Sequence, residues 1–272
     1  MANDQLGFGH WDLNQMIDIH SHILPGIDDG AQTLDDSLAM AEVAASDGVR
    51  TIVATPHNVG WDASYNRQRI VSLVADLQAE LDARRIGIEL VPGVEAYIAP
   101  DLIEQLRAER AFTLGGTRYL LLELPLSAYP IYTEQIIFEL QVEGIVPILA
   151  HPERNAVIQE DPNVLFNLVR RGVLSQITAA SLTGVFGPLA RERALVFLEH
   201  NLAHVIASDA HGLSHRTPVL SGGVSEAAKV VGEERARAMV TAVPAAILRD
   251  EEIEIEPPRE FHPQRRWFWA GA

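Results

Sequence analysis

Residues 16–54 read MIDIHSHILPGIDDGAQTLDDSLAMAEVAASDGVRTIVA, which contains two short apolar runs separated by a helix-forming segment. The runs, Met16–His20 and Thr51–Ala54, have the length and branched residues of strands buried on both faces. Between them, Thr33 begins a T-x-x-D sequence related to the capping box, and Gly48 follows the helix. A strand, a helix and a second strand in this order predict a right-handed crossover and a parallel sheet.

The same alternation continues along the chain. Five further apolar runs follow, at Glu89–Val94, Tyr119–Leu124, Val146–Ala150, Leu174–Ala179 and His204–Ala207. Segments with helical spacing of apolar residues separate them, at residues 70–81, 133–143, 163–171 and 188–200. Seven strands within about 200 residues predict an α/β fold in one closed or nearly closed, TIM-like (β/α)7 barrel. An open, doubly wound sheet is the structural alternative.

Both ends of the chain depart from this pattern. Residues 1–15 are polar and lack the basic start and apolar stretch of a signal peptide, so we interpret them as an N-terminal extension. The main domain is expected to span residues 16–250. Residues 251–272 contain Pro257-Pro258 and are expected to form a C-terminal tail. Its basic and aromatic cluster at 265–269, RRWFW, could dock on an anionic membrane or cover an apolar patch.

Composition excludes several classes of protein. The chain has 272 residues, no cysteine and a net charge of −16. Disulfides, zinc–thiolate sites and cysteine-nucleophile enzymes are therefore ruled out. The acidic balance disfavours a nucleic-acid partner. No apolar run approaches the roughly 18 residues of a membrane span, so we expect a cytoplasmic protein that is not integral to a membrane.

Polar residues follow the predicted strands where each strand ends. His20 and His22 lie on one face of the first strand, because side chains alternate with period two. The later strands and the first loop add further histidines and carboxylates, namely Asp29, His57, Glu95, Glu123, His151, Asp209 and His211. Since the carboxyl ends of barrel strands meet at one rim, we expect these side chains to gather there. Asp18 shares the parity of His20 and is expected to orient an imidazole, a plain strand-end hydrogen bond being the alternative.

This set of side chains suits metal ions. Five histidines and four carboxylates without sulfur favour Mn, Fe or Zn. Nine ligands exceed one catalytic zinc site and are enough for two or three ions if one carboxylate bridges. Such ions give an acidic protein a pocket for an anion and supply a metal-held hydroxide for phosphoryl transfer. Arg154 and Arg216 lie in loops of the same rim, and their planar forks match phosphate oxygens.

The motifs MIDIHSHILPGIDDG, TIVATPH, GVEAY, LLLELP, ILAHPER and VIASDAHGLSHR occur in this order over residues 16–250. They resemble the polymerase-and-histidinol-phosphatase (PHP) superfamily, and within it the bacterial manganese-dependent protein-tyrosine phosphatases of capsular and exopolysaccharide gene clusters. Asp29 and Glu123 stand where histidinol-phosphate phosphatases usually have histidine, which favours the tyrosine-phosphatase branch.

The resemblance implies a distorted seven-stranded barrel with three divalent ions, expected to be Mn²⁺, with Fe or Zn as alternatives. By position, one ion would be held by His20, His22, Glu95 and Asp209, a second by Glu95, Glu123 and His151, and a third by Asp29, His57 and His211. Arg154 and Arg216 match the family's phosphate-binding arginines. The family's usual substrate is the tyrosine-rich tail of a membrane-associated tyrosine autokinase that controls polysaccharide export.

Three other functions stay open at this point. A phosphatase of the same superfamily could act on a small metabolite such as histidinol phosphate. An amidohydrolase on a similar barrel would normally carry a bridging lysine, and the chain has glutamate at Glu123. A non-catalytic, metal-stabilised binding module would need neither the full ligand set nor the two arginines.

Overall fold

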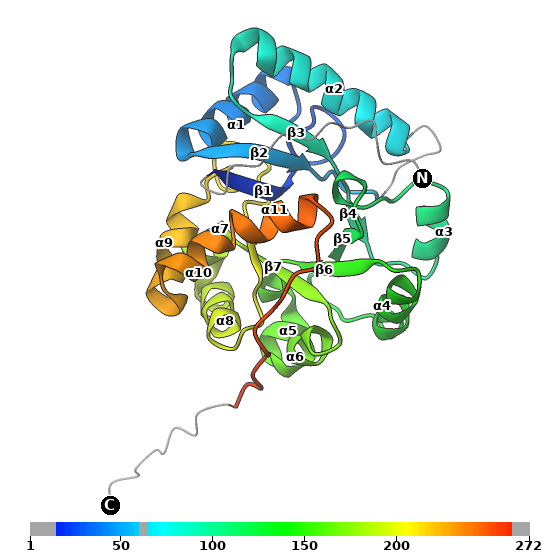
Figure 1. The fold of residues 1–272 in the computed structure, drawn as a ribbon, viewed down its shortest axis with the longest axis vertical. Coiled ribbons are helices and arrows are strands. Elements are labelled where there is room, and N and C mark those ends of the chain that lie inside the picture. Colours follow the sequence, from blue (N-terminus) through cyan, green and yellow to red (C-terminus); the bar gives the residue numbers. More distant parts are fainter. Residues whose placement is uncertain (1–14, 60–64, 263–272) are drawn as a thin grey trace, which may run out of the picture.

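The computed structural model describes residues 15–59 and 65–262, in which strands and helices alternate as predicted (Figure 1). The basic and aromatic cluster at 265–269 and residues 1–14 of the predicted extension lie outside the described residues. All pairs of neighbouring strands are parallel. The α/β class and the parallel pairing predicted from residues 16–54 are therefore confirmed.

The strands form two sheets. The first sheet has the order β1-β2-β3, with β1 at Met16–Ser21, β2 at Val49–Ala54 and β3 at Glu89–Pro92. The second has the order β4-β5-β6-β7-β8, with β4 at Glu95–Tyr97, β5 at Tyr119–Glu123, β6 at Val146–Ala150, β7 at Leu174–Thr178 and β8 at Val205–Ala207. Isolated bridges join Ser21 to Ala210 and His57 to Glu95, so the two sheets approach at both edges.

The expected single ring of seven strands is not confirmed, because the described residues form eight strands in two sheets without a continuous ladder. The predicted strand at residues 89–94 is divided at Pro92 and Gly93. Proline has no N–H to donate to a ladder, and a Cβ at Gly93 would lie 2.8 Å from Cγ1 of Val53. The chain shifts there from β3, which pairs with β2, to β4, which pairs with β5.

Helices cover the outer faces of both sheets (Figure 1). The helices of the described residues are α1 (Leu34–Asp47), α2 (Arg67–Arg84), α3 (Leu102–Arg107), α4 (Thr133–Val142), α5 (Ala156–Glu160), α6 (Asn163–Val169), α7 (Ala179–Leu182), α8 (Gly187–Glu199), α9 (Ser221–Val231), α10 (Glu233–Ala238) and α11 (Ala242–Leu248), with 3-10 turns η1 (Leu114–Gly116) and η2 (Pro152–Arg154). All but α11 lie outside the sheets (Figure 1). The predicted start of α1 is confirmed as a capping box between Thr33 and Asp36, and Gly48 ends that helix with φ 98°.

An apolar cluster fills the space that the strands enclose. We call it the interior cluster, and its buried members are Ile17, Ile19, Val53, Val91, Leu114, Tyr119, Leu121, Ile148, Ala150, Leu174, Val205, Ala207, Ala245, Ile247 and Leu248. Helix α11 contributes the last three and lies across the amino ends of the strands (Figure 1). The amino end is thus closed by apolar packing, which leaves the carboxyl end for polar side chains.

The described part of the predicted tail, residues 251–262, packs along the amino end. Tyr119 donates its hydroxyl to the carbonyl of Glu251 at 2.5 Å, and Asn201 donates to the carbonyl of Pro257 at 3.0 Å. These bonds hold the segment without helix or strand structure. Among the described residues, no helix combines the length and the apolar character needed to cross a membrane.

Candidate metal centre

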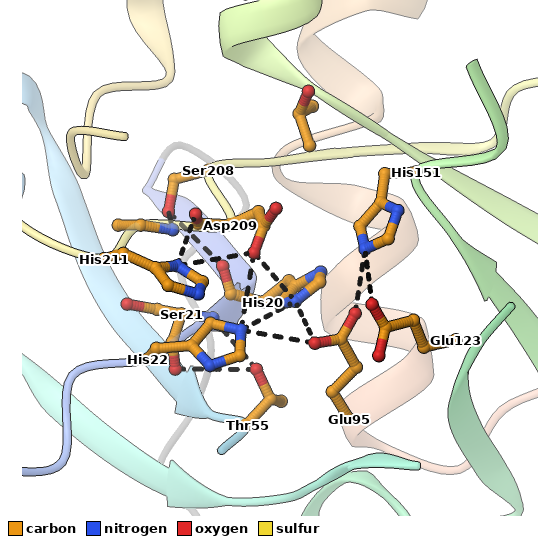
Figure 2. A network of polar contacts seen from close by, with 12 residues as sticks. His20, Ser21, His22, Thr55, Glu95, Glu123, His151, Ser208, Asp209 and His211 are labelled. Carbon is orange, nitrogen blue, oxygen red and sulfur yellow. Dashed lines mark hydrogen bonds and ion pairs between the residues drawn. The ribbon is translucent and has the colours of Figure 1, made fainter. Parts of the chain in front are cut away.

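The first predicted ligand group meets at the carboxyl end of β1 (Figure 2). The Nε2 atoms of His20 and His22 lie 3.2 Å apart. His20 Nε2 is also 3.2 Å from Asp209 Oδ1 and 3.3 Å from Glu95 Oε2. All four side chains are fully buried. Two imidazoles and two carboxylates therefore converge on one point.

The local backbone makes this convergence possible. The register of β1 against β2 shifts between Asp18 and Ser21, so the strict alternation assumed from the sequence breaks at the end of the strand. After His22 the chain turns back, and a Cβ at Gly30 would overlap the carbonyl oxygen and Cβ of His22. Only glycine permits the loop to approach the histidine so closely.

Glu95 lies at the centre of the site and faces two further histidines. Its Oε1 is 2.9 Å from His151 Nε2, and its Oε2 is 2.9 Å from His57 Nδ1. Glu123 lies beside it, 3.4 Å from His57 Nδ1 and 3.9 Å from His151 Nε2. The structure thus brings together Glu95, Glu123 and His151, and it adds His57 to that group.

The third predicted group lies at the open side of the site. Asp29 Oδ1 is 3.2 Å from His211 Nε2 and 3.5 Å from His57 Nε2. His22 joins this group, since one ligand atom from each of the four residues lies within 4.8 Å of the others. The Asp29 side chain is 64% exposed, whereas Glu95 and Asp209 are buried. The site is therefore exposed to solvent on the side of Asp29.

Several buried atoms at the centre have no hydrogen-bond partner. They are Glu95 Oε2, Asp209 Oδ1 and His211 Nε2. Neighbouring nitrogen atoms lie within about 3.5 Å of these oxygens, but not in hydrogen-bond geometry. An unpaired buried carboxylate oxygen is costly, and a cation between the converging atoms would satisfy it. The donor set, imidazole and carboxylate without sulfur, fits borderline to hard divalent ions.

Electrostatics in the site lower the pKa of Glu95 and Asp209 and raise the pKa of His20, His22 and His57. His211 differs, because burial and the nearby charge of His22 lower its pKa to about 3 and keep its imidazole neutral. Burial by itself lowers the pKa of His57, but the close carboxylates of Glu123 and Glu95 outweigh it and raise the pKa to about 10. Burial by itself raises the pKa of Asp209, but the charge of His20 helps to hold it well below its usual range. A divalent cation bound here would displace these protons, so metal binding is expected to depend on pH.

Two of the predicted ligands have strained backbone conformations. His151 has φ 33° and Asp209 has φ 53°, in the left-handed region that residues other than glycine rarely adopt. Such strain persists only where the surrounding structure enforces it, and it is concentrated at functional sites. Both residues follow directly on strand ends, where the left-handed turn accompanies their convergence on the site.

The two predicted arginines also reach the site. Arg154 Nη2 and Arg216 Nη2 lie 2.5 and 2.6 Å from the same oxygen of Asp209, Oδ2. The guanidinium of Arg154 stacks on the ring of Phe186, 4.6 Å from its centroid. Two cationic forks beside a cluster of metal-type ligands form a place for an anion with several oxygens.

None of the hydrogen bonds of the Asp18 side chain is made with an imidazole ring. Its carboxylate accepts from the backbone N–H of His20 at 3.2 Å and from the backbone and hydroxyl of Ser208, at 3.0 and 2.5 Å. This geometry favours the strand-end hydrogen bond over the expected orientation of an imidazole. Asp18 ties the end of β1 to the segment that carries Asp209.

Sequence reasoning missed the residues that do hold the two imidazoles of β1. Gln176 Oε1 lies 2.9 Å from His20 Nδ1, and Asp28 Oδ2 lies 2.7 Å from His22 Nδ1. Gln176 could have been noticed as a polar side chain inside the apolar run of β7. Asp28 lies next to Asp29 in the sequence, and only Asp29 was predicted to have a role.

Comparison with known proteins shows which family the chain belongs to. The family model described as capsular polysaccharide synthesis, CpsB/CapC, matches residues 16–249. The chain is 39% identical to the tyrosine-protein phosphatase YwqE of Bacillus subtilis, over 90% of this chain and 96% of YwqE. It is 35% identical to the putative tyrosine-protein phosphatase CapC of Staphylococcus aureus, over 93% and 99% of the two chains.

A solved structure is similar over the same length. The crystal structures of YwqE and of CpsB from Streptococcus pneumoniae are described as unique metal-dependent tyrosine phosphatases, and the matched chain superposes with a TM-score of 0.86 at 37% identity. The match covers 91% of this chain and all of that one. The protein belongs to the CpsB/CapC family of capsular polysaccharide synthesis proteins.

Proposed function

We propose that this protein is a metal-dependent phosphatase that hydrolyses phosphotyrosine in proteins. One observation supports the proposal most strongly. Buried imidazoles and carboxylates converge on Glu95 and Asp209, whose Oε2 and Oδ1 atoms have no hydrogen-bond partner. Arg154 and Arg216 stand beside that centre, in a chain similar over nine-tenths of its length to named tyrosine-protein phosphatases.

Three divalent ions, Mn²⁺ first among them, are proposed as the cofactors. The first would be held by His20, His22, Glu95 and Asp209, the second by Glu95, Glu123 and His151, and the third by Asp29, His57 and His211. Glu95 is proposed to bridge the first two of them, since its Oε2 faces His20 and its Oε1 faces His151. We also propose that the two sheets together act as a distorted (β/α)7-type barrel, with these ligands on its rim.

The protein's own residues then bind and orient the substrate. Bound divalent ions lower the pKa of water and screen the charge of a phosphate ester. Arg154 and Arg216, now on Asp209, are the groups that would hold the phosphoryl oxygens, because a guanidinium offers paired donors to two oxygens. The leaving phenol has a pKa of about 10, so its departure needs less protonation by a general acid than that of an alkyl alcohol.

The proposed partner is a phosphotyrosine protein, in this family's pattern a membrane-associated tyrosine autokinase that controls polysaccharide export. The location proposed for this reaction is the cytoplasm. The exposed Asp29 side fits a protein substrate, since a tyrosine on a flexible segment can enter from there.

Phosphate release separates this proposal from its rivals. The full chain, stripped with a chelator and reloaded with Mn²⁺, is assayed on a phosphotyrosine peptide and on histidinol phosphate. We expect kcat/KM to favour the peptide by about tenfold or more, and activity to disappear without metal. Faster turnover of histidinol phosphate would indicate a metabolite phosphatase. No release from either substrate with Mn²⁺, Fe²⁺ or Zn²⁺ would indicate a binding module.

A further inference from the structure

Two buried side chains stand directly behind the histidines of β1, on the side away from the proposed ions. Asp28 Oδ2 accepts from His22 Nδ1 at 2.7 Å, and Gln176 Oε1 accepts from His20 Nδ1 at 2.9 Å. Gln176 is fully buried, and the Asp28 side chain is 5% exposed. Neither residue contributes to the groups of side chains that could hold an ion.

These two contacts determine which ring nitrogen faces the site. An ionised carboxylate and an amide oxygen only accept hydrogen bonds, so each Nδ1 must carry a proton and donate it. Each neutral ring then presents a lone pair on Nε2, and the two Nε2 atoms are those that meet at 3.2 Å beside Glu95 and Asp209. The opposite tautomers would turn an N–H toward the ions.

Asp28 does more than hold one ring. Its Oδ2 also accepts from the backbone N–H of His57 at 3.1 Å, and its Oδ1 accepts from the backbone N–H of Gly30 at 2.9 Å. One carboxylate therefore links the histidine after β1, the tight turn beyond it and the histidine after β2. Three N–H donors converge on two oxygens, and an asparagine could not accept all three.

Gln176 stays in place although part of it has no partner. Its Nε2 is buried without a hydrogen-bond acceptor, while its Oε1 is kept on His20. Because burying an unpaired amide N–H₂ is unfavourable, hydrophobic packing alone would be better served by methionine or leucine of similar size. The polar residue is explained by the acceptor that it provides.

We propose that Asp28 and Gln176 are positioning residues that fix His22 and His20 with Nε2 toward the metal ions, and that Asp28 in addition sets the spacing between the ligands of β1 and β2. The proposal rests on the metal-dependent function proposed above. It predicts effects on metal affinity that appear without any substrate. Removal of such supporting contacts typically weakens metal binding by about 10- to 100-fold.

The test is calorimetric titration of MnCl2 into the full chain after chelator treatment. Asp28→Asn and Gln176→Met are each expected to raise the Kd by about 10- to 100-fold. Gln176→Glu, which keeps an acceptor behind His20, is expected to stay close to the wild-type Kd. The control is Asp36→Asn, the same chemical change in the exposed capping box of α1, and its Kd should not change.

The possible outcomes distinguish failure of the proposed metal-dependent function from failure of the positioning roles alone. Absence of Mn²⁺ binding by the wild-type chain would overturn the proposed function itself. Wild-type binding with an unchanged Kd in both Asp28→Asn and Gln176→Met would overturn only the positioning roles. Equal weakening in Gln176→Met and Gln176→Glu would show that the acceptor behind His20 is not what Gln176 supplies, and this would also overturn its role. Melting curves of the metal-free variants show whether Asp28→Asn is folded, and the Gln176 pair tests the proposal without that substitution.

Discussion

Two histidines at opposite ends of the strands have pKa values shifted in opposite directions. His57 follows β2 at the carboxyl end, where Glu123 and Glu95 raise its pKa to about 10 despite partial burial. His204 precedes β8 at the amino end, where burial and the nearby charge of Arg235 lower its pKa to about 4. The His57 imidazole is therefore protonated at neutral pH, whereas the His204 imidazole is neutral. His211 shows that the position alone does not decide this, because it lies at the carboxyl end and burial lowers its pKa to about 3.

The same contrast holds for packing. The amino end is closed by Ala245, Ile247 and Leu248 of α11, which complete the interior cluster. The carboxyl end contains buried atoms without partners and the strained backbone of His151 and Asp209. The amino end is not free of either feature, since His204 Nε2 is buried without a partner and Asn201 has φ 57°. The contrast lies in the side chains, because apolar residues close the amino end and ionisable residues fill the carboxyl end.

The largest predicted effect comes from the carboxyl end. Glu95→Gln should lower phosphatase activity on the order of 10³-fold or more and reduce the metal content, because the carboxylate proposed to bridge two ions becomes a neutral amide with one oxygen. Elemental analysis and turnover of a phosphotyrosine peptide check this. Full metal content together with wild-type turnover would contradict the position of Glu95 at the centre.

Replacement of the arginines should affect turnover while sparing the metal. Arg154→Ala and Arg216→Ala are each expected to reduce turnover about 10²- to 10³-fold, the size of effect seen when one preorganised donor to a transition state is lost. Metal content is measured in parallel. If both variants lose their metal, the arginines support the site through Asp209 and do not bind phosphate.

At the amino end, substitution should affect stability and leave catalysis intact. Ile247→Ala removes buried apolar volume from the interior cluster, which should lower the free energy of unfolding by about 2–5 kcal/mol. Urea unfolding measures the loss, and turnover per folded molecule should match the wild type. A marked loss of turnover in the folded variant would show that the two ends are coupled.

The smallest predicted effect is the pH dependence of the free energy of unfolding that comes from His204. The pKa of His204 is about 4 in the folded protein and about 6.5 in the unfolded chain. Between these pH values the unfolded chain binds a proton that the folded protein does not. Stability from this group is therefore complete above pH 6.5 and falls as the pH drops toward 4, by up to about 3 kcal/mol.

His204→Asn isolates this contribution. The amide oxygen of asparagine can still accept from the backbone N–H of Ser175, as His204 Nδ1 does at 3.0 Å. The variant should be less stable at pH 7 because the ring is lost, but its free energy of unfolding should fall less between pH 7 and pH 5. Parallel curves for the metal-free wild type and variant would refute the assignment.

The sequence predicted the carboxyl end better than the amino end, for a physical reason. His20, Glu95 and Asp209 stand out because polar residues are costly after apolar strands, and parallel strands bring such positions together. The division of the third strand was not foreseen, although the Pro92-Gly93 pair inside the run Glu89–Val94 is a turn signal.

Other features depend on contacts between residues distant in sequence. Gln176 contacts His20 although the two residues are 156 positions apart in the sequence, and no local sequence pattern predicts such a pair. The segment 251–262 reads as a tail from composition, yet its hydrogen bonds with Tyr119 and Asn201 attach it to the amino end. Pattern reasoning thus finds elements and their ends, while partners and register shifts need the three-dimensional structure.

Anomalous diffraction at the manganese absorption edge, from crystals of the Mn²⁺-loaded protein, tests the central claim most directly. The account predicts anomalous peaks within coordination distance of His20, His22, Glu95 and Asp209, with further peaks beside Glu123 and His151 and beside Asp29, His57 and His211. Peaks elsewhere on the molecule, or none among these side chains while the crystal contains Mn²⁺, would contradict it.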